Sequence, residues 1–221
     1  MTAFYRTLTF SKIFWIFFIG CFFGVVIETV WCIFRNKRYE SRTGLIYGPF
    51  NLVYGFGAVV MTLSLSWLTG QRDLWIFLAG TIVGGVYEYL CSIIQEKTLG
   101  TVSWYYKELP LNLNGRINLL YCIFWGLLGL LWVKDIYPAI LNLINMIPKE
   151  LETTLLPLCF VFMIFNTIMS ACVVYRMKKR FENIPPENRF WKYIDKHYPD
   201  ERVKKIYPNM VFDLSTLGQT R

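Results

Sequence analysis

The chain has 221 residues, of which 55% are hydrophobic and only 17% are charged, and its formal net charge is +8. Soluble globular proteins carry about 25% charged residues, so this composition excludes an ordinary soluble domain and favours a membrane protein. The six cysteines have no C-x-x-C spacing and there is a single histidine, which indicates neither a zinc site, nor a disulfide framework, nor bis-histidine haem. We therefore expect no metal and no cofactor.

Five apolar runs follow one another, and each is close to the roughly 20 residues that a membrane-spanning helix needs. They are residues 13–34, 47–70, 74–94, 117–133 and 153–175. Glu28 and Glu88 are the charged residues within them. The sequence predicts an all-α polytopic integral membrane protein with about five transmembrane helices. The first run is too long and too rich in large aromatics for a cleaved signal peptide.

Residues 15–28 and 75–88 are two copies of one stretch, WIFFIGCFFGVVIE and WIFLAGTIVGGVYE, with seven of fourteen positions identical at an offset of sixty. Both copies carry the pattern G-x-x-x-G-x-x-x-E, formed by Gly20, Gly24 and Glu28 and by Gly80, Gly84 and Glu88. Four residues turn a helix by about 400°, so the two glycines and the carboxylate lie along one stripe. We expect the glycines to serve close helix packing.

A second match follows each copy, because Pro49-Phe50-Asn51-Leu52 is echoed by Pro110-Leu111-Asn112-Leu113 at an offset of sixty-one. We interpret this as a tandem parallel two-helix repeat, with repeat 1 at about 11–70 and repeat 2 at about 71–134. An extra helix at about 153–175 has no counterpart. In a parallel duplication, the two glutamates lie at one depth and face one shared space. Proline and glycines in 47–57 also predict broken or re-entrant backbone, which needs protein or water to cover it.

Lysine and arginine are unevenly placed along the chain. The loops 35–46 and 95–116 and the tail from Arg176 hold four, three and eleven of them, against five on the opposite side. By the positive-inside rule, the N-terminus lies outside and the C-terminus in the cytoplasm of a cell membrane. The chain is thus divided into a transmembrane domain, 1–175, and a basic cytoplasmic tail, 176–221.

Two shorter segments also predict helices near the membrane surface. Residues 137–148 are bounded by prolines and are too short to span, which favours an interfacial helix. In the tail, Phe190, Trp191, Ile194 and Tyr198 share one helical face, which predicts an amphipathic helix on the cytoplasmic surface. We expect this basic tail to meet anionic lipid, and no nucleic acid.

The carboxylates of Glu28 and Glu88 are the first candidates for function, since an ionised acid within a span costs about 2.5–3.5 kcal/mol and is rarely left without a partner. They could bind a cation or a cationic substrate, hold an exchangeable proton, or act as a general acid/base pair. Alternatively, they accept hydrogen bonds from the following loops and pair with Arg42 or Arg116, which would lock the two repeats together. The candidate substrate-binding residues are Glu28, Glu88, Arg116, Asn51, Asn112, Tyr54 and Trp104. Trp104, Tyr105 and Tyr106 form an aromatic cluster that suits the membrane interface or the wall of a substrate site.

Several motifs resemble one family. They are G-x-x-x-E in the first run, R-T-G-L-I-Y-G-P-F followed by Y-G-F-G, E-Y-L-C-S with Glu96 beyond it, and P-L-N-L-N-G-R-I. In order and spacing, they resemble the bacterial CmpB-like family of ABC-transporter type IV proteins over roughly residues 11–134, and the resemblance implies a permease-like membrane component. Asn51-Leu52 stands where Cys-Pro is common in that family, and Trp104-Tyr105-Tyr106-Lys107 lacks the aspartate of a W-D-Y segment. If that aspartate matters, this member differs in substrate or lacks a step.

We therefore expect a small-molecule or ion transporter, or a permease-like subunit, with its site between the first and third helices. The P-loop pattern G-x-x-x-x-G-K-[ST] is absent from the sequence, so any ATPase would be a separate subunit. Five helices enclose little volume, which favours a homodimer or a partner subunit in the lipid bilayer. An intramembrane enzyme acting on a lipid or isoprenoid substrate is the second hypothesis, and we prefer a non-enzymatic role to it. A non-catalytic binding or scaffold subunit is the third.

Overall fold

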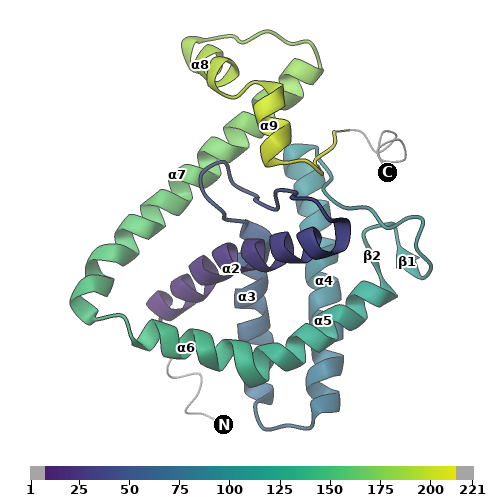
Figure 1. Ribbon diagram of the computed structural model, residues 1–221, viewed down its shortest axis with the longest axis vertical. Coiled ribbons are helices and arrows are strands. Elements are labelled where there is room, and N and C mark those ends of the chain that lie inside the picture. The colour runs from purple at the N-terminus through teal and green to yellow at the C-terminus, as the bar shows by residue number, and fades with distance from the viewer. Residues whose placement is uncertain (1–7, 213–221) are drawn as a thin grey trace.

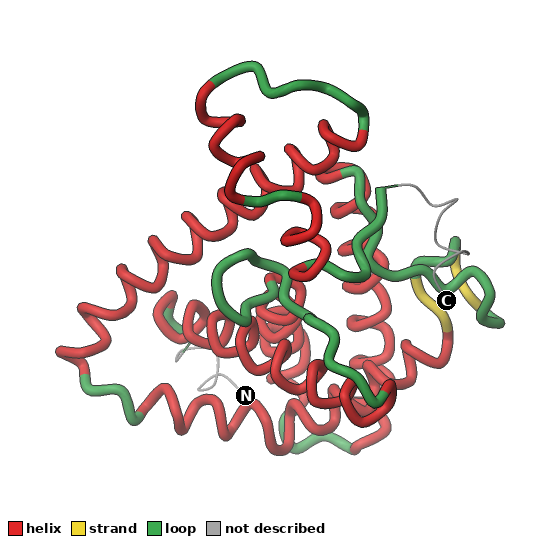
Figure 2. The backbone as a smooth tube through the Cα atoms, turned by 45° about the horizontal axis from the view of Figure 1, so that its top comes forward, coloured by secondary structure: helices red, strands yellow, loops and turns green. Residues whose placement is uncertain are grey.

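The computed structural model describes residues 8–212, and most of them are helical (Figure 1). The elements in chain order are α2 (Phe10–Asn36), α3 (Leu52–Leu65), the 3-10 turn η1 (Ser66–Leu68), α4 (Asp73–Leu99), β1 (Asn112–Leu113), β2 (Ile117–Asn118), α5 (Leu119–Leu131), the π-helix η2 (Trp132–Ile136), α6 (Tyr137–Asn145), α7 (Lys149–Phe181), α8 (Arg189–His197) and α9 (Asp200–Ile206). β1 and β2 pair antiparallel as a small hairpin, drawn in yellow in Figure 2.

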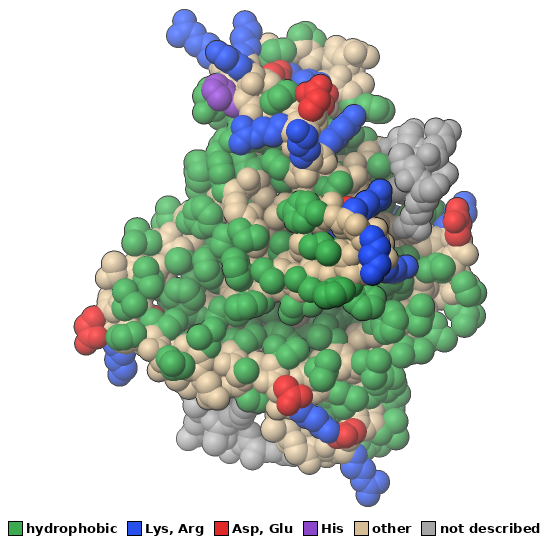
Figure 3. Space-filling view, viewed as in Figure 1, with side chains coloured by type: hydrophobic (Ala, Val, Ile, Leu, Met, Phe, Trp, Pro, Cys, Tyr) green, Lys and Arg blue, Asp and Glu red, His purple; other side chains and the backbone are tan. Residues whose placement is uncertain are grey.

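Four helical units among residues 8–212 are long and apolar enough to cross a membrane. They are Phe10–Asn36, Asp73–Leu99, Leu119–Asn145 and Lys149–Phe181. The remaining apolar run forms the shorter helix Leu52–Leu68, because residues 47–51 before it are not helical. Hydrophobic side chains cover the middle of the face in Figure 3, with charged side chains above and below. The predicted all-α membrane class is confirmed, and the second run is shorter than a full span.

The helices pack in the order in which they occur along the chain. α2 packs on α3, α3 on α4, and α4 most extensively on α5 (Figure 1). The largest apolar core joins α2, α3, α4 and η2 through Ile16, Met61, Leu65, Ile76 and Trp132. α3 therefore lies between α2 and α4, the two helices that carry the repeated stretch.

The helix that begins at Leu119 does not end near residue 134. It continues through η2 into α6 as one unit, Leu119–Asn145. Pro138 stands at the start of α6, directly after the π-helix. A proline lacks the N–H for an α-helical bond and clashes with the preceding turn, and the wider π-turn accommodates it. The separate interfacial helix predicted at 137–148 is therefore wrong, because most of that segment extends the third of the four spanning units.

The loop before α3 is non-helical backbone, as its proline and glycines predicted, and α7 covers it. Asn166 lies on α7 and is fully buried. Its side-chain oxygen accepts from the Tyr47 N–H at 3.1 Å, and its Nδ2 donates to the Tyr47 carbonyl at 2.7 Å. One turn further on, the Ser170 hydroxyl accepts from the Ile46 N–H at 2.9 Å. Two polar side chains of α7 thus satisfy the backbone groups that the broken segment exposes.

The segments that precede α3 and α5 differ in structure. Asn51 caps α3 and accepts from the Val53 N–H at 3.0 Å, and Asn118 caps α5 in the same manner from the Tyr121 N–H at 3.0 Å. Asn112 lies in β1, where its amide donates to the Leu109 carbonyl at 2.7 Å and its oxygen accepts from the Gly115 N–H at 2.9 Å. Asn112 therefore does not cap a helix as Asn51 does, because a hairpin is inserted before α5.

The amphipathic helix predicted in the tail is α8, but most of its apolar face packs against protein. Ile194 is 0% exposed and packs with Val173 and Met177 of α7 and Val203 of α9. Tyr198 is buried as well, and its hydroxyl lies 2.6 Å from that of Tyr47. The residues expected on the membrane surface instead dock α8 onto α7, and Phe190 remains exposed at 45%.

Candidate functional site

The glycine stripe of α2 brings this helix against α3. A Cβ added to Gly20 would lie 2.7 Å from the Ala58 Cβ, and one added to Gly24 would lie 2.3 Å from the Tyr54 Cβ. Contacts this short leave room for hydrogen only, so α2 can cross α3 closely at these two positions. The next turn of α2 carries Glu28, which is thereby placed near the start of α3.

The stripe of α4 makes the same kind of contact with α5. A Cβ on Gly80 would lie 3.2 Å from the Gly129 Cα, and one on Gly84 would lie 2.3 Å from the Trp125 Cγ. The next turn of α4 carries Glu88. In both helices, the pair of glycines therefore packs on the helix that follows in the chain, and the carboxylate comes one turn later.

Glu88 is buried between two neutral hydrogen-bond donors. The Tyr106 hydroxyl donates to its Oε1 at 2.8 Å, and the Trp125 indole N–H donates to its Oε2 at 2.7 Å. The residue is 9% exposed. Within residues 8–212, no lysine or arginine forms an ion pair with it. Its carboxylate therefore has hydrogen bonds but no compensating charge.

Glu28 has a weakly held cationic partner. Arg42 lies in the loop before α3, with its Nη1 3.6 Å from the Glu28 Oε1 and its Nη2 3.0 Å from the Glu40 Oε2. The Asn51 amide donates to the Arg42 carbonyl at 3.1 Å and fixes this part of the loop. The Glu28 side chain is 35% exposed, so it is more open than Glu88. Of the two arginines considered as partners, Arg42 is the one beside Glu28.

Tyr106 links the two carboxylates electrostatically. Burial raises the pKa of its hydroxyl, and the charges of Glu88 and Glu28 raise this pKa further. At neutral pH, Tyr106 is therefore a protonated donor within electrostatic range of both acids. In the sequence it is one of three adjacent aromatics, and nothing in their order distinguishes it as the partner of Glu88.

Arg116 belongs to a neighbouring cluster. It forms an ion pair with Glu96, and its Nη1 donates to the Ser92 hydroxyl at 2.9 Å. The Trp104 indole N–H donates to the Arg116 carbonyl at 3.2 Å, so Trp104 supports the same cluster. Ser92 and Glu96 lie one and two turns beyond Glu88 on α4. The structure thus gathers Glu28, Tyr54 and Asn51 around the start of α3, and holds Arg116 and Trp104 at the end of α4.

Four residues of this region have roles that their sequence positions do not indicate. They are Trp125 and Tyr106 beside Glu88, and Asn166 and Ser170 behind the loop. The available signal for the last two was an asparagine and a serine one helical turn apart in the uncharged run 153–175. In the part of the chain that the structure describes, no three His, Cys, Asp or Glu side chains gather as a metal site requires.

Apolar helices of spanning length, with a broken segment covered by protein, define a polytopic all-α membrane protein. The chain belongs to the family described as "Putative ABC-transporter type IV", whose model matches residues 15–171. The match confirms the resemblance found over 11–134 and extends it through much of α7. No curated protein and no solved structure matches the chain.

Proposed function

We propose that the protein is a small transporter or permease-like subunit whose polar site contains Glu28 and Glu88 and takes a cation or a proton. The observation that carries this proposal is Glu88, a buried carboxylate with two neutral donors and no cationic partner among the described residues. An ionised acid in a span is costly, so a cation or proton that neutralises it gains affinity from the site itself.

The surroundings of Glu28 support the same function. Arg42 is closer to Glu40 than to Glu28, at 3.0 Å against 3.6 Å, so its hold on Glu28 is the weaker of the two. An entering cation can therefore replace Arg42 beside Glu28 without leaving the guanidinium unpaired. The partial exposure of Glu28 provides the access that the buried Glu88 lacks.

The helix α3 lies between the two helices that carry the carboxylates of the proposed site. Glu28 and Glu88 stand on the two helices that flank α3, and Tyr87 beside Glu88 donates to the Val53 carbonyl in the first turn of α3 at 2.6 Å. The helices α8 and α9 lie at the upper end of Figure 1, with the loop before α3 below them and the hairpin to the right. We assign this end to the cytoplasm from its excess of lysine and arginine. The ATPase that the family description suggests would be a separate subunit that meets this end.

Flux through reconstituted protein tests the proposal. Vesicles containing a pH-sensitive or Na⁺/K⁺-sensitive dye receive an imposed gradient of protons, Na⁺ or K⁺, with tetraphenylphosphonium as a model organic cation. We expect the wild-type protein to dissipate at least one gradient above the level of empty vesicles. Glu28→Gln and Glu88→Gln should each lower that flux at least tenfold, since each loses the charge but keeps the shape of the side chain.

Glu150→Gln is the matched control, because Glu150 is exposed in the first turn of α7. It removes the same charge and should leave flux unchanged. Unchanged flux in both Glu28→Gln and Glu88→Gln, with a normal unfolding temperature in detergent, would overturn the proposal. Equal losses in all three variants would also overturn it, because they would reflect overall charge and not this site.

A further inference from the structure

The position of α8 along α7 places it at the membrane boundary. Ile194 of α8 packs against Val173 and Met177 of α7. Val173 belongs to the uncharged run 153–175, and basic residues begin at Arg176. α8 therefore lies beside the last turns of a spanning helix, at the level where lipid headgroups begin.

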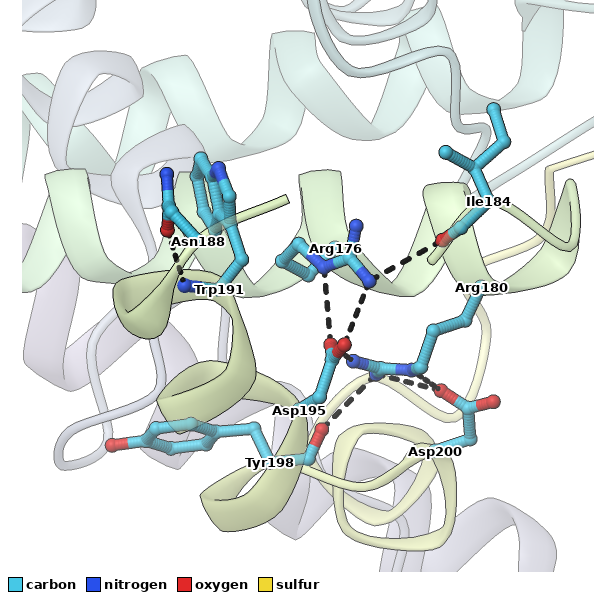
Figure 4. A network of polar contacts seen from close by, with 8 residues as sticks. All are labelled: Arg176, Arg180, Ile184, Asn188, Trp191, Asp195, Tyr198 and Asp200. Carbon is cyan, nitrogen blue, oxygen red and sulfur yellow. Dashed lines mark hydrogen bonds and ion pairs between the residues drawn. The ribbon is translucent and has the colours of Figure 1, made fainter. Parts of the chain in front are cut away.

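A network of ion pairs fixes the orientation of α8 (Figure 4). Asp195 accepts from Arg176, which is 2% exposed, at 2.7 Å, and also from Arg180. Arg180 in turn reaches Asp200 at the start of α9 at 2.7 Å. Since Asp195 and Ile194 are both held against α7, the opposite face of α8 points outward.

The outward face of α8 is basic and aromatic. Arg189, Lys192 and Lys196 are exposed and recur at helical spacing, with Tyr193 52% exposed beside them and Phe190 45% exposed at the edge of the apolar face. None of the three cations forms a salt bridge within the described residues. Figure 3 shows Lys and Arg side chains gathered at this end of the molecule.

Aromatic residues also lie at this headgroup level on α7. Tyr175 is 45% exposed, and its ring lies 5.3 Å from that of Trp191 on α8. The Lys179 ammonium stands 5.7 Å over the Tyr175 ring. Exposed tyrosine and tryptophan next to lysine are typical of the headgroup zone of a bilayer.

We propose that Arg189, Lys192 and Lys196 bind the anionic headgroups of the surrounding bilayer. Headgroup phosphates complement the three unpaired cations, and Phe190 and Tyr193 contact the glycerol region. An acidic protein would match the charge but would not explain why the exposed aromatics stand at the end of an apolar span. The surface is separate from the Glu28 and Glu88 site, so it does not depend on the proposed transport.

Native mass spectrometry of the full-length protein in detergent tests this surface by measuring the binding of phosphatidylglycerol and phosphatidylcholine. We expect the wild-type protein to prefer phosphatidylglycerol. The triple variant Arg189→Gln/Lys192→Gln/Lys196→Gln should lose on the order of 100-fold in affinity for it, at about fivefold for each charge, with binding of phosphatidylcholine unchanged. An unchanged unfolding temperature in phosphatidylcholine micelles verifies the fold.

The matched control is Arg35→Gln/Lys37→Gln/Lys107→Gln, which removes three exposed cations from the end of α2 and the loop before β1, segments that the charge distribution places on the same side. It should retain affinity for phosphatidylglycerol within about threefold, below the loss of even one contact charge. Equal losses in the two triple variants, or the absence of any preference for phosphatidylglycerol, would overturn the proposal. So would displacement of the lipid by glycerol phosphate or by polyglutamate at equal concentration, because either result would assign the face to a soluble ligand or to an acidic protein.

Discussion

At the scale of single residues, Gly84 packs against the Trp125 ring, whose indole N–H donates to Glu88. A Cβ at Gly84 would stand 2.3 Å from the Trp125 Cγ, so the indole must move and its bond to Glu88 must weaken. We predict that Gly84→Ala lowers the free energy of unfolding by about 1–3 kcal/mol. Thermal unfolding in detergent measures the loss.

Gly57→Ala serves as the comparison for Gly84→Ala. Its added Cβ would lie 3.3 Å from the edge of the Tyr87 ring, which can shift by a few tenths of an ångström. Its loss should therefore be clearly smaller. A Gly84→Ala protein as stable as Gly57→Ala would show that α4 and α5 do not pack this closely.

Asn166 provides a second test at this scale. Asn166→Leu removes both side-chain bonds to the Tyr47 backbone and leaves the N–H and C=O of this half-buried residue without these partners. We predict a loss of about 1–3 kcal/mol per unsatisfied group in the free energy of unfolding. Thr167→Val is the control, since it removes only the bond to the Met163 carbonyl within α7. Similar unfolding temperatures for the two variants would contradict the role given to Asn166.

The sequence identified the two carboxylates and offered Arg42, which lies beside Glu28, as a partner, but for a physical reason it did not identify the partners of Glu88. A glutamate in an apolar run is visible from composition alone. Whether Trp125 reaches Glu88 depends on where α4 crosses α5. Because a hairpin precedes α5, that crossing does not lie at the position that the sixty-one-residue offset between the two repeats would give. Spacing along the chain carries no information about such an insertion.

At the scale of elements, the docking of α8 on α7 should depend on pH. Burial alone would raise the pKa of Asp195, but hydrogen bonds and charges from Arg176 and Arg180 outweigh it and lower this pKa. The folded pKa is thus below the ordinary value of 3.8, so the stabilisation is complete above that value and is lost as pH falls through the lowered pKa.

Hydrogen exchange of the α8 amides, corrected for intrinsic rates, measures this docking. We predict stronger protection in the wild-type protein at pH 6 than at pH 3. Asp195→Asn should reduce protection at pH 6 and abolish the difference between the two pH values. Equal protection of the wild-type helix at both pH values would contradict a stabilising role for the Arg176–Asp195–Arg180 network.

The existence of α8 was predictable from its pattern, but the partner of its apolar face was not. An apolar stripe fits lipid or protein equally well, and only the neighbouring Val173 and Met177 decide between them. The continuation of α5 through η2 was hidden for a similar reason. A proline usually ends a helix, and the π-turn before Pro138 offsets its effect without a sequence signal.

At the scale of the whole molecule, the membrane class was predictable because the length of each apolar run and its lack of charge suffice. The order in which the helices pack was not, since lipid-facing and protein-facing residues are equally apolar. The family match over residues 15–171 includes α2 to α5 and much of α7, and it leaves α8 and α9 outside. The central prediction is that the two matching stretches make Glu28 and Glu88 parts of one site.

A double-mutant cycle on cation or proton flux tests this prediction most directly. Glu28→Asp and Glu88→Asp keep each charge but withdraw it by one methylene, so each variant should retain measurable flux. If the two carboxylates serve one site, the fold-loss of flux in the double variant should differ from the product of the two single fold-losses. The reason is that each substitution then changes the interaction of the other carboxylate with the same substrate. Losses that multiply would show two independent positions and would contradict the paired site.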